Sequence, residues 1–246
     1  LALDLDSGEV NWVYQALKLD AWNIACEGTP TANCPKENGP DYDMASTLLL
    51  TTNTGRQLVI GGQKSGHVHA VNPDSGELIW KKKIGRGGVF GGIHFGMAAL
   101  GNTLFVPVSD KPDGREYETG GTPGLHALDA DTGEVLWYAP APDDVCGERS
   151  FCAPGISQAI TVISEKVFAG GMDGVMRVYE PNSGKVLLQI DPARPFQTTS
   201  GAEASGGSFS GGSGAIAANG RVFVSSGYGI FGHMPGNLLL ALESGD

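Results

Sequence analysis

The stretch ALDADTGEVLW at residues 127–137 decides the fold of this chain. The same pattern occurs three more times, as ALDLDSGEVNW at 2–12, AVNPDSGELIW at 70–80 and VYEPNSGKVLL at 178–188. Each copy is an apolar run, a polar turn that ends in Gly, and a second apolar run with Trp four residues after that Gly, except that the fourth copy has Leu188 in place of Trp. The turn glycines recur at intervals of roughly 50 to 70 residues, which indicates propeller blades or another repeat array.

The polar turn has a simple physical explanation. Its Asp and Ser or Thr side chains cap the turn with hydrogen bonds, and Gly takes the positive φ. A calcium loop is the alternative for residues 4–6 and 129–131, but that motif needs a third oxygen ligand and a Glu at its twelfth position. Neither is present, so each copy is predicted to be a β-hairpin.

Further strands are predicted between the copies. Apolar or β-branched runs bounded by Gly, Asn or Asp occupy residues 57–61, 103–108, 160–169 and 221–225. About four strands per repeat predict an all-β fold, a β-propeller of four-stranded blades. We expect Trp12, Trp80 and Trp137 in equivalent buried positions between blades. A fifth copy begins at Leu240, so the chain holds about four to five blades.

Composition agrees with a β-protein and excludes several classes of partner. There are 38 glycines among 246 residues, and Gly is destabilising by about 1 kcal/mol in a helix interior. The net charge of −11 argues against nucleic acid and anionic lipid as partners. No apolar run reaches the roughly 18 residues of a transmembrane segment. The chain opens at Leu1 with neither an initiator Met nor a basic leader, and we expect it to be a piece of a longer protein.

Four cysteines form two close pairs along the sequence. Cys26 and Cys34 enclose one short loop, and Cys146 and Cys152 enclose another. This spacing predicts the disulfides Cys26–Cys34 and Cys146–Cys152 and favours an oxidising compartment. The sequence contains neither Cys-x-x-Cys nor Cys-x-x-Cys-His, which leaves a zinc ribbon, thioredoxin chemistry and a c-type haem without support.

The repeat resembles the tryptophan-docking repeat of the quinoprotein alcohol dehydrogenases. Members of that family are eight-bladed propellers that hold pyrroloquinoline quinone (PQQ) and Ca²⁺ on the propeller axis. Non-enzymatic propellers such as the outer-membrane assembly factor BamB carry similar repeats. The insertions between repeats are similar to those of the polyvinyl alcohol dehydrogenases: DAWN at 20–23, GPDYD at 39–43, GGQKSG at 61–66, GGIHFGM at 91–97 and MPGN at 234–237. The resemblance implies that residues 1–246 are a partial PQQ-dependent dehydrogenase propeller domain.

The resemblance implies a catalytic base at Asp43. Alcohol oxidation by a quinone needs a base that removes the hydroxyl proton, and Asp, with a pKa near 3.9, is ionised at neutral pH. In the family this Asp lies in a Trp/Tyr-Asp-Tyr/Phe stretch soon after a docking repeat, where Tyr42-Asp43-Met44 stands here. Asp43 would also contact the metal. Asp41 is the second choice for the base. The alternative is that Asp41 and Asp43 are both solvated loop carboxylates. With Asp43 as the base, Asp41→Asn is expected to be nearly silent.

The resemblance also assigns cofactor contacts. A Lys or Arg at the position of Lys64 contacts the quinone oxygens in the family and stabilises the charge that develops there; a hairpin-tip Lys is the alternative. The Gly-rich segment 85–96 lacks the Gly-Lys-Ser/Thr ending of a phosphate loop. We interpret it as backbone that approaches a flat ligand, with Gly92 and His94 as cofactor contacts; a structural role for His94 is the alternative.

The other histidines have weaker interpretations. His67 and His69 lie on one strand face and could supply two metal ligands, but no third ligand is near in sequence. His126 is expected in the core.

Two functions follow from the resemblance. The first is a periplasmic enzyme that oxidises polymeric or secondary alcohols, such as polyvinyl alcohol, with PQQ and Ca²⁺ and passes electrons to a cytochrome c. Its remaining calcium ligands and the Trp that stacks on the quinone are expected in missing N-terminal blades, before Leu1, so the fragment is expected to be inactive alone. The second is a non-catalytic propeller, a protein-binding scaffold of the cell envelope. The scaffold needs neither Asp43 nor Lys64, which favours the enzyme.

Overall fold

The computed structural model describes residues 1–229 and 231–243, and their regular secondary structure is almost entirely β-strand, joined by turns and long loops. The 3₁₀ turn η1 (Ile24–Cys26) is the one helical segment among them. No helix of the described residues is long and apolar enough to cross a membrane. The predicted all-β fold is confirmed.

Three antiparallel sheets of four strands form the centre of the molecule. The first contains β3 (Met44–Thr51), β4 (Gln57–Gln63), β5 (His67–Val71) and β6 (Leu78–Lys83). The second contains β7 (Ala98–Leu100), β8 (Thr103–Val108), β9 (Gly124–Asp129) and β10 (Val135–Pro140). The third contains β12 (Thr161–Ile163), β13 (Lys166–Gly170), β14 (Met176–Tyr179) and β15 (Val186–Ile190). Strands pair in sequence order within each sheet, which is the up-and-down order of a propeller blade.

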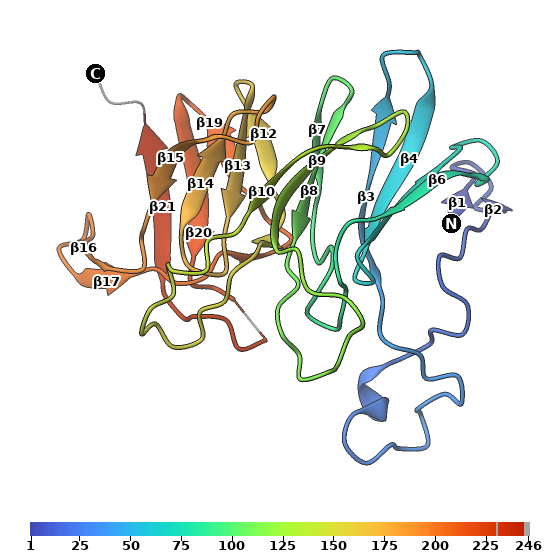
Figure 1. Ribbon diagram of the computed structural model, residues 1–246, viewed down its shortest axis with the longest axis horizontal. Helices are drawn as coiled ribbons and strands as arrows, with labels where there is room; N and C mark the ends of the chain where they lie inside the picture. Colours follow the sequence, from blue (N-terminus) through green and yellow to red (C-terminus); the bar gives the residue numbers. More distant parts are fainter. Residues whose placement is uncertain (230, 244–246) are drawn as a thin grey trace.

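Smaller sheets lie at the two ends of this row. β1 (Ala2–Leu3) pairs with β2 (Val10–Trp12), and β19 (Ile216–Ala218), β20 (Arg221–Ser226) and β21 (Leu238–Glu243) form a three-stranded sheet. Two short pairs belong to loops: β11 (Ser157–Gln158) with β18 (Ser210–Gly211), and β16 (Pro195–Gln197) with β17 (Glu203–Ser205). The blades follow one another in chain order, and long loops gather at their lower ends in Figure 1.

The hydrophobic core lies between successive blades. Fully buried side chains of the first two four-stranded blades meet there: Leu58, Ile60, Val68, Leu104, Val106 and Leu128. A second cluster joins the next pair of blades around Phe105 and Val167, and a third reaches the last sheet around Phe209 and Val224. Each blade therefore depends on its neighbours for burial of its apolar faces.

The docking tryptophans join neighbouring blades. The indole N–H of Trp80 donates to the carbonyl of Ala130 at 3.0 Å, and its ring packs on Gly133 of the next turn. Trp12 and Trp137 do the same one blade earlier and one blade later, with donor–acceptor distances of 2.8 Å and 2.9 Å to the carbonyls of Pro73 and Pro181. All three rings are half-buried. Their equivalence is as predicted, but their burial is partial, not complete as expected.

The turn itself has the predicted hydrogen bonds. In the third copy Oδ1 of Asp129 accepts from the amide and the hydroxyl of Thr132, and Gly133 has a φ of +73°. In the fourth copy, Leu188 pairs with Val178 in the register that Trp137 has with Ala127, so it occupies the docking position with a smaller, non-donating side chain. Ser244 and Gly245 of the fifth copy lie outside the described residues.

One strand expectation is wrong. Residues 160–169 form a hairpin of β12 and β13 rather than a single strand. Ser164 and Glu165 make its two-residue turn with φ values of +47° and +57°, a primed turn built without Gly or Asn.

We expect the docking contact to be measurable through its glycine. Gly133→Ala places a methyl group about 2.6 Å from the Trp80 ring, whereas Gly8→Ala, at nearly the same φ of +74°, meets nothing within 4 Å. Both variants carry the strain of a positive φ, so the difference between their free energies of unfolding measures the cost of packing the methyl group against Trp80. Gly133→Ala should be less stable than Gly8→Ala by roughly 1–3 kcal/mol in urea unfolding. Equal stability would contradict a docking role for Trp80.

Both predicted disulfides are present, Cys26–Cys34 and Cys146–Cys152, and the described residues contain no free cysteine. Each bridge closes a short loop and is worth roughly 2–3 kcal/mol in the loop-entropy model. We expect thiol titration of the denatured, unreduced protein, purified from an oxidising compartment, to detect almost no free thiol. Four reactive thiols, or peptides linked in another pairing, would contradict this assignment.

Candidate functional site

Asp20 fixes the backbone of the segment that leads into β3. Its two carboxylate oxygens accept the amide N–H groups of Asp41 and Tyr42, at 3.1 and 2.7 Å. Asp41 has a φ of +65°, a left-handed conformation uncommon for a residue other than Gly. Gly39 lies so close to Asp20 that a Cβ would overlap its backbone. Backbone strain of this kind concentrates at functional sites.

Lys64 lies between two carboxylates. Its Nζ is 2.7 Å from Oδ2 of Asp43 and 3.2 Å from Oδ2 of Asp41. The side chains of Lys64 and Asp41 are 12% and 6% exposed, whereas that of Asp43 is 66% exposed. Burial raises the pKa of Asp41, and the Lys64 ammonium opposes that rise. Asp41 is therefore an enclosed partner of Lys64, and Asp43 faces solvent.

The interpretation of Asp41 as a solvated loop carboxylate is thus wrong. The sequence spacing alone gives no reason for one of two aspartates, two residues apart, to be buried. The left-handed turn at Asp41 and the clamp from Asp20 direct this side chain inward. A nearly silent Asp41→Asn is no longer expected, since the substitution removes a buried charge that faces Lys64.

The turn between β4 and β5 presents Lys64 to these carboxylates. The amide of Lys64 donates to the carbonyl of Asp43 at 3.1 Å. The side-chain amide of Gln63 donates to the carbonyl of Tyr42, and the hydroxyl of Ser65 donates back to Gln63 at 2.6 Å. The turn and the segment 41–43 are therefore one hydrogen-bonded unit.

Asp110 organises the Gly-rich segment behind this turn. The carboxylate of Asp110 is buried and accepts the amide N–H groups of Arg86, Gly87, Gly92 and Thr122. A Cβ on Gly92 would overlap the carbonyl of Lys64, so Gly is needed for close packing of the two segments. Gly92 thus supports the turn of Lys64, and its direct contact with a cofactor stays a prediction.

His94 lies near enough to Lys64 and Asp43 to feel their charges, and we call the region of these three side chains the mouth; His94 itself is only 6% exposed. Its Nδ1 is 2.8 Å from the hydroxyl oxygen of Ser157, a residue of β11. Burial above all, together with the positive charge of Lys64, lowers the pKa of His94 to about 4, so the ring is neutral at pH 7. A neutral imidazole near Lys64 and Asp43 can donate or accept one hydrogen bond without adding charge.

A loop from the last sheet closes over this side. The Nζ of Lys111 donates to the carbonyls of Phe231 and Gly232 at 2.8 and 3.0 Å. The ring of Phe231 lies 5.7 Å from that of Phe90 and 6.0 Å from that of His94. Cationic and aromatic side chains from three sheets therefore meet around His94.

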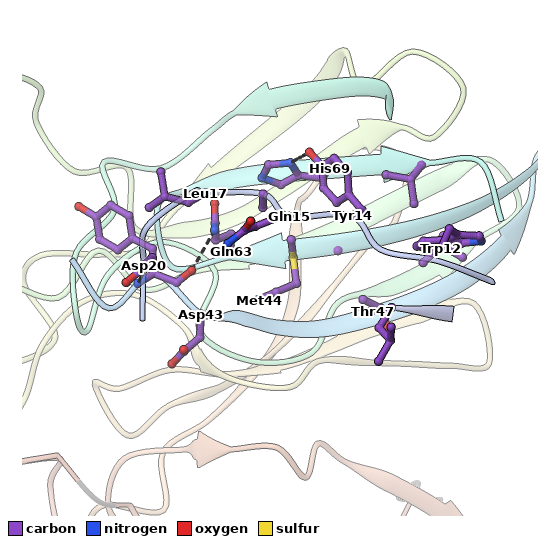
Figure 2. Close-up of a pocket in the computed structure, with 16 residues that line it drawn as sticks. Trp12, Tyr14, Gln15, Leu17, Asp20, Asp43, Met44, Thr47, Gln63 and His69 are labelled. Carbon is purple, nitrogen blue, oxygen red and sulfur yellow. Dashed lines mark hydrogen bonds between the residues drawn. The ribbon is translucent and has the colours of Figure 1, made fainter. Parts of the chain in front are cut away.

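A cavity of about 400 Å³ lies beside this mouth, between residues 12–20 and the blade of β3–β6. Figure 2 shows Trp12, Tyr14 and Met44 along it, while Asp43 points away from the other labelled side chains. Asp43 is nevertheless one of the residues that line the cavity, so this aspartate lies at the edge of the cavity.

Three of the other histidines, His67, His69 and His126, have local partners. His69 is bonded to the hydroxyl of Tyr14 at 2.7 Å and His67 to that of Ser65 at 3.0 Å. His126 is buried and stacked on Tyr138, which confirms its place in the core. Across residues 1–229 and 231–243, no group of three or more His, Cys, Asp or Glu side chains could hold a metal ion.

Sequence reasoning missed three residues that shape the site: Asp20, Asp110 and Ser157. Each acts through hydrogen bonds to a segment far away in sequence. Asp20 and Asp110 are polar residues in predicted loops, and the sequence does not distinguish buried from solvated carboxylates there.

Two curated relatives match nearly the whole chain. A polyvinylalcohol dehydrogenase of a Pseudomonas species is 40% identical over 232 residues, and one of a Sphingopyxis species is 38% identical over 235 residues. Each match covers 93% of this chain but only 35% and 36% of the relative. The chain therefore spans about a third of the length of these relatives.

Solved propeller structures are similar at a lower level. BamB from Moraxella catarrhalis is 13% identical with a TM-score of 0.45, and the two chains are covered to 75% and 48%. The quinohemoprotein alcohol dehydrogenase ADHIIG from Pseudomonas putida is 14% identical with a TM-score of 0.45, over 72% of this chain and 36% of that one.

The PQQ_2 family model, described as outer membrane protein assembly factor BamB, matches residues 64–187 and 127–237. These two overlapping matches cover more than half of the sequence. The resemblance expected from the docking repeats is confirmed, and the chain belongs to the PQQ_2 family.

Proposed function

We propose that the protein is a quinoprotein alcohol dehydrogenase that oxidises polymeric or secondary alcohols, polyvinyl alcohol among them, with PQQ as hydride acceptor. The observation that carries this proposal is the arrangement of Lys64 between a buried Asp41 and an exposed Asp43. The two relatives named polyvinylalcohol dehydrogenase support the choice of substrate.

The chain's residues fit one side of a quinone site. PQQ, when bound, supplies the carbon that accepts a hydride. Lys64 would hold the quinone oxygens with its ammonium group, and neutral His94 would lie beside it. A cation fixed near a developing negative charge is already oriented for the reaction, which is the basis of electrostatic catalysis.

The calcium site does not fit the described residues alone. Asp43 offers one exposed carboxylate, and no cluster of three ligands exists within the described part of the chain. We place Asp43 as one ligand and expect the others, with the Trp that stacks on PQQ, in N-terminal blades of the same propeller.

Asp43 removes the hydroxyl proton of the alcohol. Its carboxylate is exposed to incoming substrate and lies 2.7 Å from the ammonium group of Lys64. Asp41 is the alternative base. Its exposure of 6% makes direct contact with a polymeric substrate harder, so we assign it to the placement of Lys64.

We further propose that the protein acts in the periplasm and passes electrons to a cytochrome c. The two disulfides agree with an oxidising compartment. We infer that this chain alone is inactive, since part of the site would lie elsewhere in the protein.

A non-catalytic scaffold that binds envelope proteins is the second candidate. The family description, outer membrane protein assembly factor, is the observation that favours it. A scaffold function gives no role to the buried Lys64–Asp41 pair, so we rank the scaffold second.

Variants of the full-length protein test the enzyme. Asp43→Asn keeps the shape but removes the base, and we expect kcat to fall by roughly 10²–10⁴-fold in dye-linked oxidation of alcohols with PQQ and Ca²⁺. Lys64→Ala should lower both PQQ affinity and kcat, because the cation near the quinone oxygens is lost. Asp41→Asn should weaken PQQ binding more than it lowers kcat. Asp74→Asn, in an exposed docking turn, is the matched control and should behave like the parent.

The outcomes separate the alternatives. Near-parental activity of Asp43→Asn refutes its role as base. An inactive Asp41→Asn that still binds PQQ, together with an active Asp43→Asn, assigns the base to Asp41. A full-length protein that neither binds PQQ nor reduces the dye supports the scaffold.

A further inference from the structure

The hydroxyl of Ser157 and the ring of His94 form an isolated pair. Ser157 is fully buried on β11, and its hydroxyl oxygen lies 2.8 Å from Nδ1 of His94. Among the described residues, this imidazole is the one hydrogen-bond partner of that hydroxyl. The two residues come from different blades, so the contact forms only in the folded propeller.

The donors and acceptors available to the two residues decide which of them donates the hydrogen bond. If Nδ1 carried the proton and donated to Ser157, the serine O–H would be a buried donor without an acceptor, which folded proteins avoid. If Ser157 donates to Nδ1, both groups are satisfied. The neutral ring then carries its single proton on Nε2.

The Nε2 atom of His94 is the nitrogen that can reach a ligand. Within residues 1–229 and 231–243, the enclosed imidazole nitrogens without a partner are Nε2 of His69 and Nδ1 of His233, and Nε2 of His94 is not one of them. The charges of Lys64, Lys111 and Asp43 act on His94, which places its ring among the groups of the mouth. Because Nδ1 faces Ser157, Nε2 is the ring nitrogen left to bind a ligand in the region of Lys64.

We propose that Ser157 is a positioning residue that holds His94 as the Nε2–H tautomer, so that His94 donates a hydrogen bond to an anionic oxygen of the ligand beside Lys64. The identification of that ligand as a quinone or its carboxylates rests on the proposed function. A neutral donor suits this place because the positive charge of Lys64 is already shared with two carboxylates. The donor needs no reorientation when the ligand arrives.

Nuclear magnetic resonance can read the tautomer without any cofactor. The full-length protein is labelled with ¹⁵N-histidine, and long-range ¹H–¹⁵N correlations at pH 7 distinguish Nε2–H from Nδ1–H rings; His94→Gln assigns the signals. We expect His94 to be the Nε2–H form. Ser157→Ala should give a mixture of tautomers, whereas Ser157→Thr, which keeps the hydroxyl, should retain the parental form.

Ser208→Ala is the matched control. Ser208 is equally enclosed, but its hydroxyl donates to the carbonyl of Met172 rather than to a histidine. This variant should leave the His94 tautomer unchanged. An Nδ1–H ring in the parent, or an unchanged Nε2–H ring in folded Ser157→Ala, would overturn the proposal. If Ser157→Ala does not fold, the parental spectrum still decides the tautomer, and Ser157→Cys replaces the variant.

Titration with PQQ tests the role of the donor. PQQ should shift the Nε2 signal of His94, and Ser157→Ala should weaken PQQ binding roughly tenfold, the effect of one hydrogen bond. PQQ that binds without moving this signal refutes the donor role. A protein with the Nε2–H tautomer that binds no PQQ instead refutes the proposed function, so the two failures can be told apart.

Discussion

The contact between a docking tryptophan and the next blade's turn is the interaction on which the molecule depends. One indole supplies both a hydrogen bond to a turn carbonyl and a flat surface on a glycine, as Trp80 does with Ala130 and Gly133. The apolar faces of neighbouring blades are then held at a fixed distance, and buried side chains fill the space between them. Each contact joins two neighbouring blades. The repeats therefore place the blades one after another along an arc.

The arc in turn decides which loops meet. Residues near 41, 64, 94, 157 and 231 are far apart in sequence, yet their loops leave the same ends of successive blades (Figure 1). Buried carboxylates then fix these loops: Asp20 binds the amides of 41 and 42, and Asp110 binds four amides around the Gly-rich segment. Side chains therefore hold the backbone here, where the blades provide no sheet partner.

Sequence reasoning succeeded where the chemistry is local. The Asp-Ser-Gly turn, the tryptophan spacing and the two short disulfide loops each specify structure within about ten residues, and all are present as expected. It failed at the turn of Ser164 and Glu165, where the blade imposes a positive φ on residues that do not prefer it. It also missed the pair of His94 and Ser157, because 63 positions separate them and only the packing of blades brings them together.

The unequal exposure of Asp41 and Asp43 explains how Lys64 would keep a fixed position in the proposed site. A single ammonium group beside one exposed carboxylate would move with that loop. The buried Asp41 gives Lys64 a second partner shielded from solvent, and its own backbone is fixed by Asp20. An interaction shielded from water is stronger than the same contact at the surface. Asp41 therefore fixes the position of the cation, and Asp43 stays exposed next to it, as the proposed role of Asp43 as base requires.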